Sequence, residues 1–244
     1  MNSALPTSTA ATPPVPSARG GRAALDRRLA IAPQIHQALR ERIVSLEWLP
    51  RYQLARAEIA DEFGVSQTPV REALLRLEAD GLIVVWPQSR TVVAPIDVEK
   101  VREVTFLRRA LELEVALTVA AQQPQADLGP AQAIVDEQRI LAPDDAGLRR
   151  FLALDRDFHR RLFELAGQAT LHGLLVERSA DLDRVRRLHL PLRGKRLEIL
   201  ADHQAILGAI GASDAPAVVA AMRGHLTGTA AHLDALVAAH PDYF

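Results

Sequence analysis

The stretch "GVSQTPVREALLRLEADGLIVV", residues 64–85, decides the fold of the first part of this 244-residue chain. Gly64 opens a turn, the residues after it have helical spacing, and Gly81 separates them from a β-branched run. Ser66 or Thr68 is suited to cap the helix, and Pro69 falls in its first turn. The stretch therefore predicts a tight turn, a short helix and a strand.

The flanking segments complete a small domain. Residues 31–46 carry apolar side chains at helical spacing until Pro50, and "ARAEIADEFG" gives a second short helix that ends at Gly64. Downstream, "LIVVW" and "RTVVAPI" are β-rich runs on either side of "PQS", which predicts a hairpin. Three helices and a hairpin in this order predict a winged helix-turn-helix over residues 25–95.

The helix that follows Gly64 is the one that would enter the DNA major groove. Four polar residues lie at its N-terminal end: Ser66, Gln67, Thr68 and Arg71. Glutamine pairs with adenine and arginine with guanine, whereas serine and threonine more often hold phosphates. Arg90, at the end of the hairpin tip 88–90, is expected to reach the minor groove or the DNA backbone. Two alternatives stay open at this point: winged helices also dock proteins, and Arg71 could pair with a neighbouring acid.

Composition restricts the remaining possibilities. Hydrophobic residues make up 48% and charged residues 24% of the chain, so a core of aliphatic side chains is expected, and the net charge of -1 gives no global attraction to nucleic acid. The absence of cysteine excludes disulfides, thiolate catalysis and cysteine-type zinc sites. No apolar run approaches the roughly 18 residues of a membrane span, and no signal peptide is evident. We expect a cytoplasmic protein with no membrane partner.

The rest of the chain divides into a tail and a helical region. Residues 1–24 are rich in Ala, Pro, Ser and Thr, which predicts a disordered tail, with a DNA-contacting basic arm as the alternative. Asp97 can cap the next helix, and residues 98–240 show only helical periodicity, which predicts about six helices in an all-α bundle. The expected breaks are at Pro124, Pro143, Gly167, Pro191 and Ser213. The expected fold class is mainly α.

One carboxylate and three imidazoles stand out in this bundle. Asp155 and His159 are four residues apart and share a helix face, and His203 and His225 each lie in the middle of a later helix. Bundles build divalent-metal sites from such side chains on facing helices, and this set suits Zn²⁺, Ni²⁺, Mn²⁺ or Fe²⁺. A surface Asp–His pair and hydrogen-bonded core histidines remain the alternative, because spacing does not show that the helices converge.

Residues 31–95 resemble the DNA-binding domain of GntR-family bacterial transcription regulators, through "GVSQTPVREALLRLEADGL". The resemblance implies that the polar residues opening the recognition helix contact DNA. The chain departs from the family pattern in three places: Gln67 stands where arginine is usual, Pro50-Arg51 where Pro-Gly is usual, and Arg90 where the wing usually has glycine. These departures concern the operator sequence rather than DNA binding itself.

Residues 98–235 resemble the FCD effector domain of the FadR subfamily. The matching segments are "LRRALELEVA", "LDRDFHRRLFELAG" and "DHQAILGAIGASDAPAVVAAMRGHL". Metal-containing members use an Asp and a His four apart and two further histidines, and these match Asp155, His159, His203 and His225. The other histidines match no ligand position and are assigned to the surface or to packing: His36, His172, His189, His232 and His240.

The resemblance also implies an effector contact. In this family the metal helps to hold a small carboxylate, and an arginine on the first bundle helix commonly assists; the match is Arg108. A guanidinium group pairs bidentately with a carboxylate, so this assignment is chemically reasonable. The alternative is that Arg108 pairs with Glu112, one turn along the helix. Arg109 would point elsewhere, and Arg186 or Arg187 could add a second charge.

The expected function is a DNA-binding transcription regulator, not an enzyme. We expect a repressor that binds an inverted-repeat operator in double-stranded DNA as a homodimer and responds to a small carboxylate effector. One alternative is a regulator for which metal occupancy itself is the signal. A metal-dependent hydrolase is the other, with Asp157 and Asp202 as the nearest general-base candidates. The sequence identifies neither the effector, the metal nor the operator.

Overall fold

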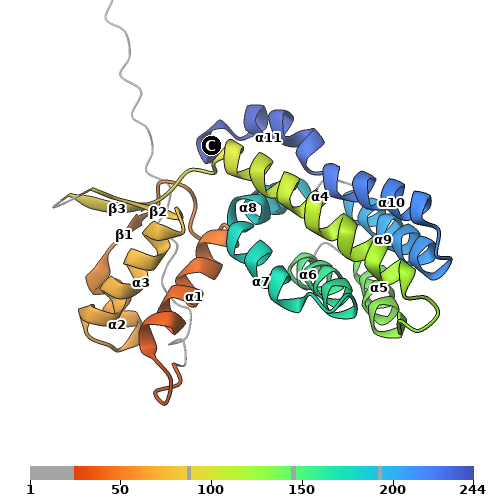
Figure 1. The fold of residues 1–244 in the computed structure, drawn as a ribbon. Coiled ribbons are helices and arrows are strands. Elements are labelled where there is room, and N and C mark those ends of the chain that lie inside the picture. The colour runs from red at the N-terminus through yellow and green to blue at the C-terminus, as the bar shows by residue number, and fades with distance from the viewer. Residues whose placement is uncertain (1–24, 87–88, 144–146, 192–193) are drawn as a thin grey trace, which may run out of the picture.

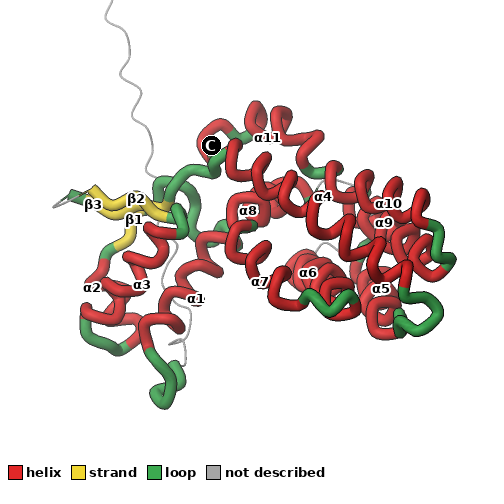
Figure 2. Tube along the Cα trace, viewed as in Figure 1, coloured by secondary structure: helices red, strands yellow, loops and turns green. Residues whose placement is uncertain are grey.

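The computed structural model describes residues 25–86, 89–143, 147–191 and 194–244; the predicted tail, residues 1–24, lies outside this range. A small helical domain with a three-stranded sheet is followed by a larger group of helices (Figure 1). Helices account for most of the described chain, and strands occur only in the first domain (Figure 2). The fold class is mainly α, as predicted.

The first domain is a winged helix-turn-helix. Its helices are α1 (Ile31–Val44), α2 (Arg56–Phe63) and α3 (Gln67–Ala79), and its strands are β1 (Gln53–Leu54), β2 (Ile83–Trp86) and β3 (Arg90–Val93). The antiparallel sheet has the order β1-β3-β2, with Ile83 opposite Val93 and Gln53 opposite Val92. Strands β2 and β3 form the predicted hairpin. Strand β1 was not predicted, because two residues are too few to show an alternating pattern.

The turn between α2 and α3 depends on Gly64. This glycine has φ +64°, a left-handed conformation that costs glycine little, and its N–H donates to the last turn of α2. Ser66 is the residue before α3, but its side chain makes no capping hydrogen bond, and Thr68 lies inside the helix. The core shared by α2 and α3 consists of the buried residues Ala60, Phe63, Val70, Leu74 and Leu77, and Val65 is half-buried against the same cluster.

Arg51 occupies the position where the resembling family has glycine. Its φ is +69°, so this arginine adopts the left-handed conformation that glycine supplies more easily. Its N–H donates to Val93 O at 2.9 Å, and its guanidinium group donates to Asp242 O and Phe244 O near the end of the chain. Arg51 therefore keeps the backbone turn that glycine would form, and its side chain adds contacts to residues 242 and 244.

The helical domain begins at α4 (Val98–Ala121). As predicted, Asp97 caps this helix: its Oδ1 accepts from the N–H of Glu99 at 2.9 Å and of Lys100 at 3.3 Å. The helices that follow are α5 (Gly129–Leu141), α6 (Leu148–Leu165), α7 (Ala169–Arg178), α8 (Ala180–His189), α9 (Lys195–Gly211), α10 (Ala215–Thr227) and α11 (Leu233–Ala239). Two short 3₁₀ helices, η2 (Ala230–His232) and η3 (Pro241–Tyr243), flank α11.

The estimate of six bundle helices was too low. The described residues after Asp97 form eight α-helices, because the chain also breaks at Ser179 and after Thr227. Neither proline nor glycine marks the break at Ser179. Its hydroxyl instead donates to Leu175 O at 2.6 Å, a local side-chain bond that competes with helix continuation.

The bundle core lies between α4, α5, α6, α9 and α10. Fully buried apolar residues from each of these helices meet there: Val119, Val135, Phe158, Ile206 and Met222. Figure 1 shows α4 running along the whole group. Polar side chains on the inner faces of α6 and α9 are therefore held in a rigid, dry environment. No helix among the described residues has the length and apolar character that crossing a membrane requires.

Helix α8 contacts both domains. Ala180 belongs to the core of the winged domain, while Leu182 and Val185 pack with Ile96 at the domain junction. The fully buried Arg184 donates to Ala94 O at 2.8 Å and to Pro95 O at 3.2 Å, and it pairs with the buried Asp181. The segment that joins the two domains is thus held by side chains of α8.

Candidate metal centre and nucleic-acid interface

The residues predicted to contact DNA are on the surface of the winged domain. All five are exposed: Ser66, Gln67, Thr68, Arg71 and Arg90. In the part of the chain that the structure describes, Arg71 forms no ion pair, so the alternative in which it pairs with a neighbouring acid is not seen. On the wing, the Arg90 guanidinium lies 4.8 Å from the ring centroid of Trp86. Gln88, also at the predicted hairpin tip, lies outside the described residues.

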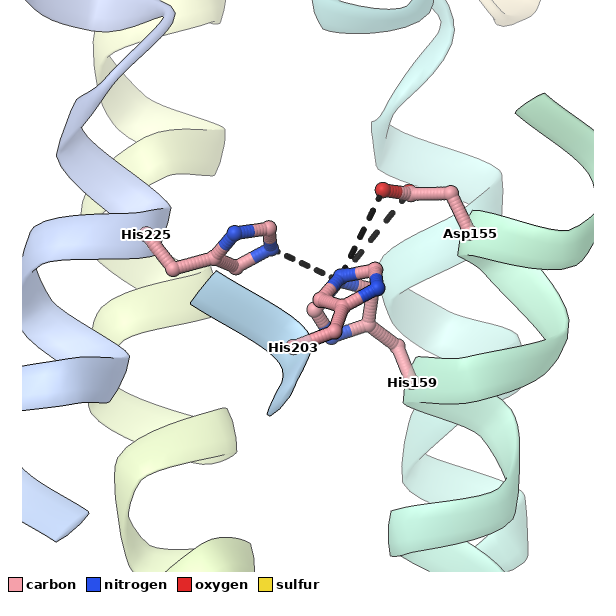
Figure 3. A group of neighbouring side chains, drawn as sticks. All are labelled: Asp155, His159, His203 and His225. Atoms are coloured by element: carbon pink, nitrogen blue, oxygen red, sulfur yellow. Dashed lines mark hydrogen bonds and ion pairs between the residues drawn. The ribbon is translucent and has the colours of Figure 1, made fainter. Parts of the chain in front are cut away.

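The four predicted metal ligands converge inside the bundle (Figure 3). Asp155 and His159 lie on successive turns of α6, His203 comes from α9, and His225 from α10. Their ligand atoms all lie within 4.8 Å of one another. His159 Nε2 is 3.1 Å from His225 Nε2, and His203 Nε2 is 3.7 Å from Asp155 Oδ1. The convergence that spacing left open is therefore present.

Each histidine has a side-chain oxygen near its other ring nitrogen. His159 Nδ1 is 2.6 Å from Glu112 Oε2, and His203 Nδ1 is 2.8 Å from the amide oxygen of Gln138. His225 Nδ1 is 3.4 Å from Asp202 Oδ2. When Nδ1 carries the proton, the Nε2 lone pairs of all three rings face the shared space. Metal-binding histidines are commonly oriented in this way.

The ionisation states also suit a metal. Burial raises the pKa of Asp155, but the Arg186 guanidinium and then the histidines outweigh it and hold this pKa well below its usual range. Arg186 Nη2 lies 2.5 Å from Asp155 Oδ2. Burial lowers the pKa of His203 well below its ordinary value, so the ring is neutral. A charged carboxylate and neutral imidazoles are the forms that bind divalent ions.

Two of these ligand atoms lack a hydrogen bond. Within the described residues, neither Asp155 Oδ1 nor His203 Nε2 makes one, although both atoms are buried, and Asp155 Oδ2 has only its ion pair with Arg186. Such atoms cost free energy unless something satisfies them. A divalent ion held by these residues would do so, and imidazole nitrogens and carboxylate oxygens are ligands that such ions accept. The residues present therefore fit a metal ion.

Arg108, the predicted effector contact, is paired in this structure. Its Nε lies 2.5 Å from Glu112 Oε1, so the alternative contact is present, and Glu112 in turn contacts His159. Burial opposes ionisation of Glu112, but Arg108 and His159 outweigh it and hold its pKa well below its usual range. Arg108 nevertheless lines the cavities on both sides of the ligand cluster. Arg109 is exposed, as predicted.

The residues that support the ligands were mostly missed in the sequence. Gln138 gave no signal, and Glu112 was considered only as a partner of Arg108, because a glutamine or glutamate on an amphipathic helix usually faces water. Arg186 was considered only together with Arg187, and spacing could not separate them. The structure does: Arg186 faces Asp155, whereas Arg187 Nη2 lies 3.5 Å from Glu41 Oε1 of α1.

The other five histidines do not join the ligand cluster in the described structure. His36 Nε2 is 2.7 Å from Asp80 Oδ2, and the His189 ring packs on His232 with centroids 4.6 Å apart. His172 lines the cavity beside the cluster on the α7 side, and the His240 ring packs against Tyr243. These contacts agree with the assignment of these residues to packing and the surface.

Comparison with known proteins gives two family matches. Residues 31–93 match the family described as "Bacterial regulatory proteins, gntR family", and residues 103–228 match the FCD domain. The chain is 32% identical over 210 residues to an "Uncharacterized HTH-type transcriptional regulator in unstable DNA locus" of Streptomyces ambofaciens, covering 86% of this chain and 88% of that protein. It is also 32% identical over 193 residues to the HTH-type transcriptional repressor RspR of Escherichia coli K12, covering 79% and 84%.

A solved structure shares the fold. The protein described as E. coli McbR/YncC superposes with a TM-score of 0.70 at 22% sequence identity, covering 85% of this chain and 98% of that one. At this identity the likeness concerns the arrangement of helices and strands, and it agrees with the architecture described above.

Proposed function

Because this chain belongs to the gntR family of bacterial regulatory proteins and carries an FCD domain, we propose that it is a repressor controlled by a small carboxylate at a metal-containing site. Like its family and relatives, this chain is a DNA-binding transcription regulator and not an enzyme. The convergence of four ligand atoms within 4.8 Å, beside the partly buried Arg108, carries the finer proposal. A homodimer on an inverted-repeat operator in the cytoplasm is the form in which such a regulator would act.

In this proposal Asp155, His159, His203 and His225 hold a divalent ion, with Zn²⁺, Ni²⁺, Mn²⁺ and Fe²⁺ as the candidates. When bound, the ion supplies a positive charge and an open position for a carboxylate oxygen. Arg108 would donate to the same carboxylate, exchanging part of its contact with Glu112 for the effector.

Helix α8 is suited to carry the signal to the winged domain. Arg186 touches the ligand Asp155, and two residues earlier Arg184 holds the carbonyls of Ala94 and Pro95. At the start of the same helix, Ala180 packs into the winged domain's core. A shift of Arg186 when the site is filled would move the whole ten-residue helix, because a helix transmits displacement along its axis.

The test of this function distinguishes a response to the carboxylate from a response to the metal ion alone. Operator DNA is first selected from random sequences with the purified protein, and binding is then followed by fluorescence anisotropy. We expect small carboxylates to release the DNA at fixed zinc concentration, and Arg108→Ala to weaken this response while the metal content stays unchanged. If chelation alone releases the DNA and no carboxylate does so, metal occupancy is the signal. The existing Arg108–Glu112 pair is the observation that favours this second candidate.

The recognition helix allows a separate prediction. Arg71→Ala is expected to weaken operator binding by about 1–3 kcal/mol, because a bidentate contact from arginine to guanine contributes that much discrimination. The measurement is the anisotropy titration at fixed salt. The control is Arg76→Ala, since Arg76 is exposed on the same helix but further from its N-terminal end, and a smaller loss is expected there. Unchanged affinity in the Arg71 variant would mean that this helix does not enter the groove as proposed.

A further inference from the structure

A small cavity on the α8, α9 and α10 side of the ligand cluster is lined by three cationic side chains: Arg108, Arg186 and Lys195. We propose that this cavity is a subsite for a second anionic group, so that the effector is a small acid with two negative groups. The inference rests on the proposed function, because it specifies the class of acid that the same site accepts.

The cavity adjoins the metal cluster, because the predicted ligand His225 lines it together with Lys195. Thr229, the residue before η2, lines it as well. The Lys195 side chain is only 11% exposed, and its Nζ lies 2.8 Å from Glu198 Oε2. Glu198 itself is 63% exposed, so water competes for this partner. A buried ammonium group is therefore available to a second anion inside the cavity.

The charges around the site favour a dianion. Three cations, Arg108, Arg186 and Lys195, have side chains no more than 13% exposed, and they lie with two buried carboxylates, Glu112 and Asp155. Three positive and two negative charges leave an excess of one, and a divalent ion makes it three. Asp202 also lines the cavity and Glu198 lies beside Lys195, but their side chains are 40% and 63% exposed, so solvent screens both charges. Buried charge of one sign is costly, and two anionic groups offset more of it than one.

Gly228 leaves room for the Lys195 ammonium group. A Cβ atom added at Gly228 would lie 3.2 Å from Lys195 Nζ, which is closer than ordinary contact. Gly228 has φ -57° and ψ -44°, so alanine fits this backbone without strain. Gly228→Ala therefore shifts the ammonium group by a few tenths of an ångström without removing its charge, and it offers a second way to disturb the subsite.

The experiment is isothermal titration of the zinc-loaded, full-length protein with matched acids. Succinate is compared with butyrate, and 2-phosphoglycolate with glycolate, so that each pair differs by one anionic group. We expect the dianions to bind about tenfold more tightly or better, since a hydrogen bond between charged groups stabilises binding to that extent. The phosphate and carboxylate arms identify which second group is preferred, and an advantage for either supports the subsite.

The variants assign this advantage to Lys195. Lys195→Met should remove the preference for the dianion while leaving butyrate affinity and zinc content unchanged, and Lys195→Arg should retain it. Gly228→Ala should reduce it and serves as the test if Lys195→Met does not fold. Lys100→Met, at an exposed lysine of α4, is the control and should keep the full preference.

Equal affinity for succinate and butyrate in the wild-type protein would overturn the subsite but leave the carboxylate-responsive function intact. A dianion preference that survives in both Lys195→Met and Gly228→Ala would also overturn it. Binding of none of the four acids to the zinc-loaded protein would reject the proposed effector site itself, and the subsite with it.

Discussion

Replacing His203 with alanine is expected to remove the bound ion and to lower the free energy of unfolding by about 4 kcal/mol when free metal is about a thousand times its dissociation constant. His203 is fully buried, its Nε2 faces Asp155, and its ring stacks on Phe158 with centroids 3.9 Å apart. Loss of one ligand of four leaves the others too few to hold the ion tightly. The measurements are metal content by elemental analysis and thermal unfolding with and without added zinc.

His189→Ala is the matched control for this experiment. His189 is only 1% exposed, so its removal also leaves a cavity in the protein, but it lies outside the ligand cluster. Some loss of stability is therefore expected in both variants, whereas only His203→Ala should lose its metal and its response to zinc. Equal loss of metal from the two variants would place the ion elsewhere in the bundle.

The ligand set illustrates what a sequence can predict about a site. Asp155 and His159 are related by local helix geometry, so their shared face follows from spacing alone. Their meeting with His203 and His225 depends on how α6, α9 and α10 pack, and no spacing in the chain encodes that. The chemistry of the residues and the family resemblance together identified a set whose convergence only the fold could show.

The difference between local spacing and helix packing also explains which features of the fold and the site were not predicted. The winged domain was predicted well, because glycine turns and β-branched runs are local signals. The break at Ser179 was missed because it depends on one hydroxyl bond to Leu175 and not on a helix breaker. The roles of Glu112 and Gln138 were missed because a polar residue on a helix becomes a metal-site partner only when its face is buried against the ligands.

Arg184→Met is expected to cost about 3–5 kcal/mol in the free energy of unfolding, which is the usual penalty for removing one partner of a buried ion pair. Arg184 is fully buried and Asp181 is 5% exposed, so the remaining carboxylate would lie uncompensated in the domain junction. The carbonyls of Ala94 and Pro95 would lose their guanidinium donor as well. Chemical denaturation of the variant and of the wild type measures the difference.

The double variant Asp181→Leu with Arg184→Met separates the loss of stability from the loss of communication between the two domains. Replacing both charges by apolar groups should recover most of the stability, because no buried charge is left unpaired. The carbonyls of Ala94 and Pro95, between the two domains, would still lack their hydrogen bonds from α8. If α8 carries the signal, zinc and carboxylates should bind the double variant normally but no longer change its operator affinity. The reason is that α8 joins the ligand Asp155, through Arg186, to the segment between the two domains, through Arg184. A double variant that is stable and still responds in DNA binding would show that the signal passes by another route.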